Sequence, residues 1–106
     1  MNEKKNPKLD HPSLLGRVRA AVTSGEYRIL PHARQRCSER DVAAPDIENA
    51  LVTGRHVPRR DRYDEPHQAW SYCFEGASVD VDALRVVVSF DDWMLVVTVV
   101  RFGEKD

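Results

Sequence analysis

The sequence predicts an α+β fold in which N-terminal helices pack on an antiparallel sheet of about four strands. Apolar residues recur at helical spacing in the first half of the chain, and at alternate positions or in β-branched runs in the second half. A chain of 106 residues with 42% apolar residues can fill one small core. We therefore expect a single domain over residues 11–106, preceded by a flexible, Lys-rich tail over residues 1–10.

Three helices are expected in the first half of the chain. The first begins near Pro12, carries one apolar stripe and ends at Gly25. The second runs from about Pro31 to Glu39, and the third occupies the segment APDIENALVTG, residues 44–54. Proline suits the first turn of a helix because its missing N–H would have no partner there, and glycine commonly ends a helix.

Strands are expected around and after these helices. Residues 27–30, YRIL, form a short strand-like run, and a short edge strand after Gly54 leads into an exposed, Arg-rich loop. The runs AWSYCFEG, ALRVVVSF and MLVVTVVRF complete the sheet, the last two on either side of a DDW turn. The last two runs are apolar on both faces, so they are either central strands covered twice or part of a partner interface.

The segment HARQRCSER, residues 32–40, places a histidine and two arginines at four-residue spacing on the second helix. His32, Arg36 and Arg40 therefore form one stripe, and Ala33 and Cys37 form the neighbouring apolar stripe. Like charges at this spacing destabilise a helix by roughly 0.2–0.5 kcal/mol per pair unless an anion or a carboxylate offsets them. Either an acidic residue of the fold or a bound phosphate meets this need.

This stripe fits cleavage of RNA by attack of its own 2′-hydroxyl. The reaction needs a base, cations on the phosphate oxygens and an acid for the leaving 5′-oxygen. His32 is the expected base, and Arg36 and Arg40 are expected to hold the phosphate. Two further candidates are Thr98, the polar residue within VVTVV, and Tyr72, as an acid or a phosphate ligand. Both also fit as ordinary strand residues.

A second basic cluster follows the third helix, with histidine and tyrosine residues between its arginines. Such a surface can bind backbone phosphates and stack on unpaired bases. It can equally be a strand edge that uses charge and proline to prevent sheet-to-sheet aggregation. The residues expected to contact RNA are Arg34, Arg55, Arg59, Arg60, Arg62 and His67.

The charges of the chain divide unevenly, although the net charge is −1. Residues 1–62 carry thirteen Lys and Arg against eight Asp and Glu, whereas residues 63–106 carry three against nine. A basic half favours an anionic partner, although the distribution can also serve solubility alone.

Membrane and cofactor classes are not favoured by the sequence. No segment approaches the roughly 18–20 consecutive apolar residues that a membrane helix needs, so we expect a soluble, cytoplasmic protein. The two cysteines lack the paired spacing of a zinc site, and no glycine-rich phosphate loop occurs. We therefore expect neither a metal nor another cofactor.

The segment HARQRCSERDVAAPDIENALVTG, followed by a strand-rich tail with VVTVV, resembles the domain-of-unknown-function 4258 family over roughly residues 26–100. Members resemble this chain in a His-Ala-x-x-Arg helix, a second Arg four residues on, a D-I-x-x-A-L-x-x-G helix and a late Thr-Val pair. The family is similar to small ribonuclease-like toxins of the barnase, colicin and RelE type, and some members sit beside zinc-ribbon antitoxins. The resemblance implies a RelE/barnase-like fold and an RNA-cleaving toxin of a toxin–antitoxin pair, with His32, Arg36, Arg40 and Thr98 at its site.

Two other interpretations remain open. In the first, the chain is a non-catalytic module whose basic stripe docks RNA or an acidic protein, and its C-terminal strands pair with a second copy as a homodimer. In the second, the chain is a purely structural dimerising domain whose stripe is neutralised by its own Asp and Glu residues.

Overall fold

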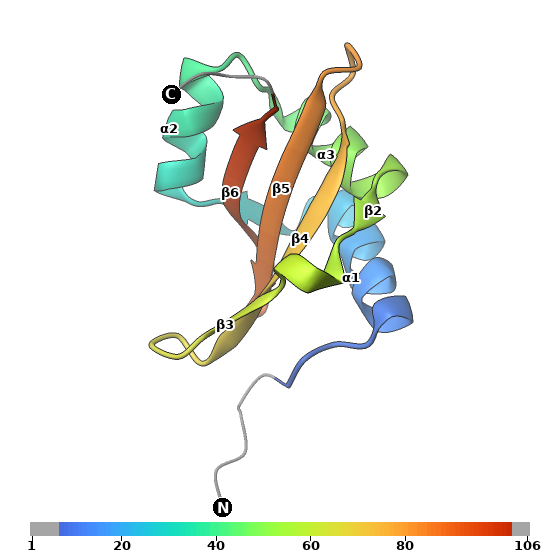
Figure 1. The fold of residues 1–106 in the computed structure, drawn as a ribbon, viewed down its shortest axis with the longest axis vertical. Coiled ribbons are helices and arrows are strands. Elements are labelled where there is room, and N and C mark those ends of the chain that lie inside the picture. Colours follow the sequence, from blue (N-terminus) through green and yellow to red (C-terminus); the bar gives the residue numbers. More distant parts are fainter. Residues whose placement is uncertain (1–6, 103–106) are drawn as a thin grey trace, which may run out of the picture.

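Three helices and six strands form the described part of the chain, residues 7–102, in a computed structural model (Figure 1). The helices are α1 (His11–Ser24), α2 (Pro31–Glu39) and α3 (Ala44–Thr53). The strands are β1 (Tyr27–Ile29), β2 (Arg55–His56), β3 (Arg62–Asp64), β4 (Ala69–Ala77), β5 (Ala83–Phe90) and β6 (Met94–Arg101). A 3₁₀ turn, η1 (Pro58–Arg60), separates β2 from β3. The expected combination of helices and strands is confirmed, and all three expected helices are present.

Local sequence explains the ends of α1. The side chain of Asp10 precedes the helix, and its Oδ1 accepts a hydrogen bond of 2.8 Å from the backbone N–H of Ser13. Gly25 follows the helix in the left-handed conformation, with φ at 79°, which glycine adopts without the steric cost of a Cβ. None of the helices within residues 7–102 is long and apolar enough to cross a membrane.

Asp46 joins the start of α3 to a distant loop. Its carboxylate accepts hydrogen bonds of 2.9 Å from the backbone N–H of Ala43, just before the helix, and from that of Val79, between β4 and β5. Both bonds favour the charged carboxylate, so the Ala43 and Val79 N–H groups hold the pKa of Asp46 below its ordinary value. One side chain therefore caps a helix and fixes the loop that follows β4.

The sheet contains six strands in the described residues, whereas the sequence predicts about four. The strand order is β1-β6-β5-β4-β2, and β3 also pairs with β4. β1 runs parallel to β6, and every other pair is antiparallel, so the sheet is mixed. β1 and β2 lie where the sequence predicts a strand-like run and a short edge strand, but with three and two residues they are too short for a period of two to show their place in the sheet. β3 forms inside the segment that the sequence predicts as a loop.

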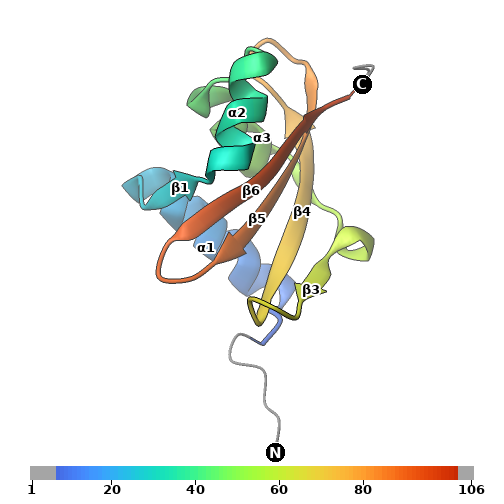
Figure 2. The same cartoon turned by 90° about the vertical axis from the view of Figure 1, so that its left-hand side faces the viewer.

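The core lies between the helices and one face of the sheet. α3 packs on β4 and β5, α1 packs on α3, and α2 packs on β6 (Figures 1 and 2). Side chains from all three helices and from the three long strands share this cluster. Its fully buried members include Leu14, Val18, Ala33, Ile47, Ala50, Phe74, Leu84, Val86, Val88 and Val96.

The alternation of faces predicted for β6 is wrong because the strand contains a bulge. A regular strand would place Val97 and Val99 together on one face, opposite Thr98. Instead Val96 pairs with Val88 and Thr98 pairs with Val87, so Val97 is an extra residue. Val96 and Val99 are both buried in the core, three residues apart. The extra residue therefore leaves Val97 and Thr98 together on the opposite face.

Two glycines allow the backbone of α3 to approach β4 closely. A Cβ built on Gly76 would lie 2.4 Å from the carbonyl oxygen of Ala50, and one built on Gly54 would lie 2.3 Å from the same oxygen. Real Cβ atoms do not come this near to backbone atoms. A methyl group at either position would therefore force the helix and the strand apart.

We predict that Gly76→Ala lowers the free energy of unfolding by about 2 kcal/mol, because overpacking of a well-packed contact costs this much. The matched control is Gly16→Ala on the exposed side of α1, where no atom lies within 4 Å of the new methyl. This control raises the free energy of unfolding by about 0.5–1 kcal/mol through helix propensity. Urea unfolding of the three proteins measures both effects, and a neutral Gly76→Ala would contradict the close packing of α3 on β4.

Candidate functional site

α2 presents two different stripes, as its sequence predicts. Ala33 and Cys37 are buried against the core, whereas His32 is exposed and Arg36 and Arg40 are half-buried. The helix has the bounds that the sequence predicts, Pro31–Glu39, with Arg40 at its C-cap. The structure therefore brings His32, Arg36 and Arg40 together on one side of one short helix.

The charges of this stripe differ in their surroundings. None of the hydrogen bonds or ion pairs between side chains of residues 7–102 involves His32 or Arg36. The nearest acidic residue of the helix, Glu39, accepts a hydrogen bond of 3.2 Å from Gln35. The interpretation in which the fold's own carboxylates neutralise the whole stripe therefore does not hold for His32 and Arg36.

α2 lies beside the half of β6 that contains Thr98. Immediately before the helix, the backbone N–H of Leu30 donates to the carbonyl of Val96 at 3.0 Å. Just after the helix, the guanidinium of Arg101 lies 3.5 Å from the carbonyl oxygen of Asp41. The helix thus continues the line of β1 along β6 (Figure 2). The strand that carries Thr98 is the one on which the basic helix packs.

The structure does not bring Tyr72 to this face of the sheet. Tyr72 pairs with Val88, whose side chain is in the core, whereas Thr98 pairs with Val87 on the opposite face. The hydroxyl of Tyr72 accepts a hydrogen bond of 2.8 Å from the backbone N–H of Leu9. Burial raises the pKa of this hydroxyl above its ordinary value. Tyr72 is therefore poorly placed to donate a proton near Thr98.

A groove of about 380 Å³ crosses the face of the sheet that carries Thr98. It extends from Leu30, just before α2, across β6 and β5 to the β3–β4 turn. Leu95 and Val97 contribute apolar surface, and Asp64 and His67 line the far end. The complete lining is Leu30, Asp64, His67, Ala69, Ser71, Ser89, Phe90, Asp91, Leu95 and Val97.

The second basic cluster is spread over β2, η1 and β3. Arg55 forms an ion pair of 3.5 Å with Glu75, and Arg62 donates to the carbonyl oxygens of Arg59 and Asp61 at 3.2 and 2.9 Å. The side chains of Arg59 and Arg60 have no ion pair with a described carboxylate. The cluster therefore mixes arginines held by the fold with two that remain available to an anion.

The other residues expected to contact RNA lie apart from this cluster. Arg34 is exposed on α2, and burial rather than this arginine dominates the raised pKa of the neighbouring Cys37 thiol. His67 is exposed in the β3–β4 turn, where its Nδ1 lies 2.5 Å from Oδ2 of Asp64. His67 therefore belongs to the groove rather than to the arginine cluster.

A hydrogen-bonded network of Asp61, His56 and His11 is not predicted from the sequence. Asp61 is 1% exposed in its side chain, and its Oδ2 lies 2.8 Å from Nε2 of His56, which is 4% exposed. Its other oxygen accepts a hydrogen bond of 3.0 Å from the backbone N–H of Cys73. Nδ1 of His56 lies 3.2 Å from Nδ1 of His11, at the start of α1, and the two rings stack.

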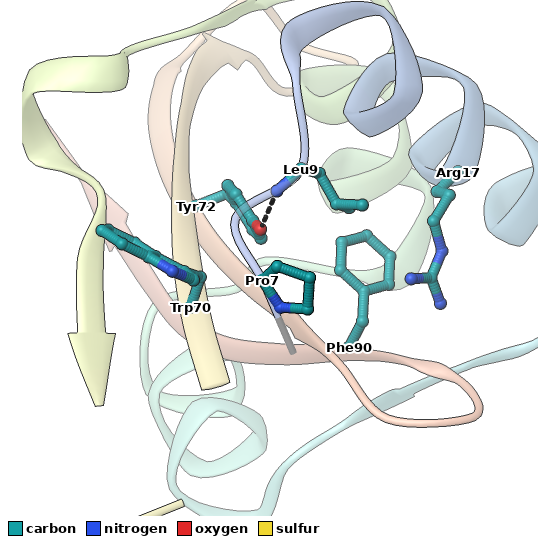
Figure 3. A pocket seen from close by; sticks show the side chains of 6 residues that line it. All are labelled: Pro7, Leu9, Arg17, Trp70, Tyr72 and Phe90. Atoms are coloured by element: carbon teal, nitrogen blue, oxygen red, sulfur yellow. Dashed lines mark hydrogen bonds between the residues drawn. The ribbon is translucent and has the colours of Figure 1, made fainter. Parts of the chain in front are cut away.

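The segment before α1 lies against the sheet, where the backbone N–H of Leu9 donates to the hydroxyl of Tyr72 (Figure 3). The ammonium of Lys8 lies 3.5 Å from Oδ2 of Asp61 and 4.8 Å from the centre of the Trp70 ring. Pro7 and Leu9 line a small pocket of about 120 Å³ beside Trp70 and Tyr72. The tail predicted over residues 1–10 lies partly outside the described residues, 7–102, and residues 7–10 make these contacts.

The described surface offers cations, imidazoles, hydroxyls and carboxylates, but no reactive thiol. Both cysteines are free and buried, and burial raises the pKa of each thiol, so neither is poised as a nucleophilic thiolate. Within residues 7–102, no group of three or more His, Cys, Asp and Glu side chains is arranged to hold a metal ion. An imidazole and a guanidinium on α2 remain as the groups best suited to act on a phosphate.

Comparison with known families gives one match. The family model described as "Domain of unknown function (DUF4258)" matches residues 29–101, which run from the end of β1 to the end of β6. No curated protein and no solved structure matches the chain. The matched segment contains α2, the groove and the arginine cluster, and it leaves out α1 and His11.

We predict that Asp61→Ala lowers the free energy of unfolding by about 3 kcal/mol, because it leaves His56 and the Cys73 N–H buried without their acceptor. The matched control is Asp80→Ala, which removes an exposed carboxylate from the β4–β5 loop and leaves stability within about 0.5 kcal/mol. Chemical denaturation measures both values. Equal stability of the two variants would show that the buried hydrogen bonds of Asp61 do not stabilise the fold.

Proposed function

The chain belongs to the family of domain of unknown function 4258, and from this premise and the geometry of α2 we propose that it is a metal-independent endoribonuclease. The observation that carries the proposal is the pairing on α2 of an exposed His32 with Arg36, neither of which has a carboxylate partner among residues 7–102. A base next to an unneutralised cation is what attack on a phosphodiester requires.

In the proposed reaction, the imidazole of His32 removes the proton from a ribose 2′-hydroxyl. The 2′-oxygen forms a bond to the adjacent phosphorus, the bond from phosphorus to the 5′-oxygen breaks, and water supplies a proton to that oxygen. The products are a 2′,3′-cyclic phosphate and a free 5′-hydroxyl. The guanidiniums of Arg36 and Arg40 bind the non-bridging oxygens, whose negative charge grows in the transition state.

Thr98 has a supporting place in this proposal. It lies on the strand against which α2 packs, and the bulge at Val97 brings its side chain to the face that carries the groove. A threonine hydroxyl donates one hydrogen bond, which suits a phosphate oxygen or the developing charge on it. Tyr72 has no role in the proposed reaction, because its hydroxyl is bound to the Leu9 N–H on the other face.

The toxin role is part of the same proposal. A nuclease that needs no metal can cleave the RNA of its own host, and a protein that covers the site would prevent this. The resemblance to RelE- and barnase-type toxins supports an antitoxin partner, of the zinc-ribbon kind that sits beside some members. The exposed side of α2 is the surface that such an antitoxin would cover.

Binding of RNA without cleavage is the second candidate function. The observation that favours it is that Tyr72, the acid expected from the sequence, lies on the opposite face of the sheet from Thr98 with its hydroxyl bound to the Leu9 N–H. Arg59 and Arg60 on η1 would supply phosphate contacts under either function. A homodimer through β5 and β6 would use their open face, because both strands are internal to the sheet.

We predict that His32→Ala lowers the rate of RNA cleavage by about 10²–10⁴-fold, the usual contribution of a general base. Arg36→Ala lowers the rate by about 10²-fold or more, because it removes a cation from the transition state. Both variants keep the unfolding temperature of the wild type, since His32 is exposed and the side chain of Arg36 has no hydrogen bond or ion pair in the described structure.

The measurement is cleavage of mixed RNA by purified protein, with and without chelator, and the wild type is expected to be equally active in both. The matched control is Ser38→Ala, an exposed substitution on the same helix, which leaves the rate unchanged. A wild type that binds RNA without cutting it would support the second function, and full activity in His32→Ala would refute the base.

Salt dependence tests the arginine cluster. We predict that replacing Arg59, Arg60 and Arg62 together by Ala weakens RNA binding. The slope of log Kobs against log salt becomes less negative by about 2, because each phosphate of a single strand that an arginine neutralises contributes roughly 0.7 to the slope. Filter binding of a single-stranded RNA at several salt concentrations measures the slope. An unchanged slope would exclude η1 and β3 from the RNA-binding surface.

A further inference from the structure

The groove on the helix-free face differs chemically from the basic helix beside it. Its walls are mostly apolar, with Leu30, Leu95 and Val97 among them, and none of the described residues that line it is an arginine or a lysine. A phosphate would therefore meet no guanidinium or ammonium among these residues, whereas a flat aromatic ring would find apolar surface on which to lie.

The polar side chains of the groove all present hydrogen-bond acceptors. Ser89 donates its hydroxyl hydrogen to the carbonyl of Trp70 at 2.8 Å, and Ser71 donates to the carbonyl of Arg62 at 3.3 Å. Their oxygens therefore face a ligand as acceptors. Asp64 and Asp91 add carboxylate oxygens, one at the β3 end of the groove and one after β5.

His67 sets the orientation of one of these carboxylates. Its Nδ1 lies 2.5 Å from Oδ2 of Asp64, and both residues line the groove. Within the described residues, no hydrogen bond is made by the second oxygen of Asp64, Oδ1. A neutral His67 that donates from Nδ1 leaves its own Nε2 as a further acceptor.

We propose that this groove is a base-binding subsite for RNA, which takes one unpaired guanine through the carboxylate of Asp64. The inference rests on the proposed function in that the ligand is RNA, and it adds the base that the site selects. Guanine presents two adjacent donors, N1–H and the 2-amino group, on its Watson–Crick edge. Uracil presents one donor between two acceptors, which would oppose the acceptors of the groove, and adenine and cytosine present one amino group each.

The position of the groove agrees with this role. Leu30 lines the groove and lies two residues before His32 in the chain, so the subsite adjoins the helix that would hold the phosphate. The acceptors of the groove repel phosphate and accept hydrogen bonds from base N–H groups, whereas the arginines of α2 attract phosphate and offer only donors. An RNA strand that crosses the groove therefore has one orientation in which a base and a phosphate both meet complementary chemistry.

The experiment measures binding of nucleoside 3′-monophosphates by calorimetry, so it does not depend on cleavage. Guanosine 3′-monophosphate is expected to bind about tenfold or more tightly than the adenosine, cytidine and uridine forms, in line with the discrimination of one bidentate contact. Inosine 3′-monophosphate, which lacks the 2-amino group, is expected to bind like these weaker ligands. Equal affinities for all five nucleotides would overturn the proposal.

Two variants locate the binding. Asp64→Asn, which exchanges one acceptor for a donor, is expected to remove the guanosine preference, while the control Asp80→Asn on the exposed β4–β5 loop keeps it. Val97→Arg, which fills the groove, is expected to abolish the same preference, and thermal unfolding of each variant verifies its fold. A guanosine preference that survives both Asp64→Asn and Val97→Arg would overturn the assignment. Tight binding of an arginine-rich peptide, together with no preference among the nucleotides, would also overturn it, because the groove would then bind protein rather than a base.

The same binding series in His32→Ala separates this inference from the proposed function. Guanosine selectivity in His32→Ala, together with its loss in Asp64→Asn, supports the subsite whether or not the wild type cuts RNA. Cleavage of RNA by the wild type without any guanosine selectivity overturns the subsite alone and leaves the ribonuclease proposal standing.

Discussion

The fold depends on an apolar layer between one face of β4, β5 and β6 and the three helices. Alternate residues of β5, from Leu84 to Phe90, point into this layer, and Ala33 and Cys37 bring α2 into the same cluster. Because the helices occupy that face and the edge of β6, the other face of the central strands remains open over the groove. The candidate site is therefore a consequence of one-sided packing, with α2 at its border.

The bulge at Val97 allows β6 to bury its valines in the core although Thr98 lies among them. A strand of eight mostly apolar residues would expose either Val96 or Val99 if it kept strict alternation through both. One extra residue allows both to enter the core, and it leaves Val97 and Thr98 side by side on the groove face. A polar side chain thus reaches the open face while Val96 and Val99 both stay buried, which explains how VVTVV accommodates Thr98.

Local patterns were sufficient to predict the helices and the stripe on α2, since a helix is determined by neighbours within one or two turns. Pro31 at the start and spacings of four were enough to place His32 with Arg36. The positions of β1 and β2 were predicted as a strand-like run and an edge strand, but their partners in the sheet were not. β1 has only three residues, and it exists because Met94, Leu95 and Val96 lie beside it, more than sixty residues later in the chain. Its parallel pairing is a tertiary property that no local periodicity contains.

The same distinction explains what was missed at the site. Asp61 and His56 stood inside a segment whose arginines suggested an exposed loop, and their burial depends on His11 and Cys73, from distant parts of the chain. The sequence shows that the two halves of the chain differ in charge, but it does not predict which surfaces these charges form. In the structure the acidic half contributes Asp64 and Asp91 to the groove, while the basic half contributes α2 next to it. Two surfaces of opposite preference then meet at Leu30, so a ligand with an anionic backbone and donor-rich bases would be oriented by the border between them.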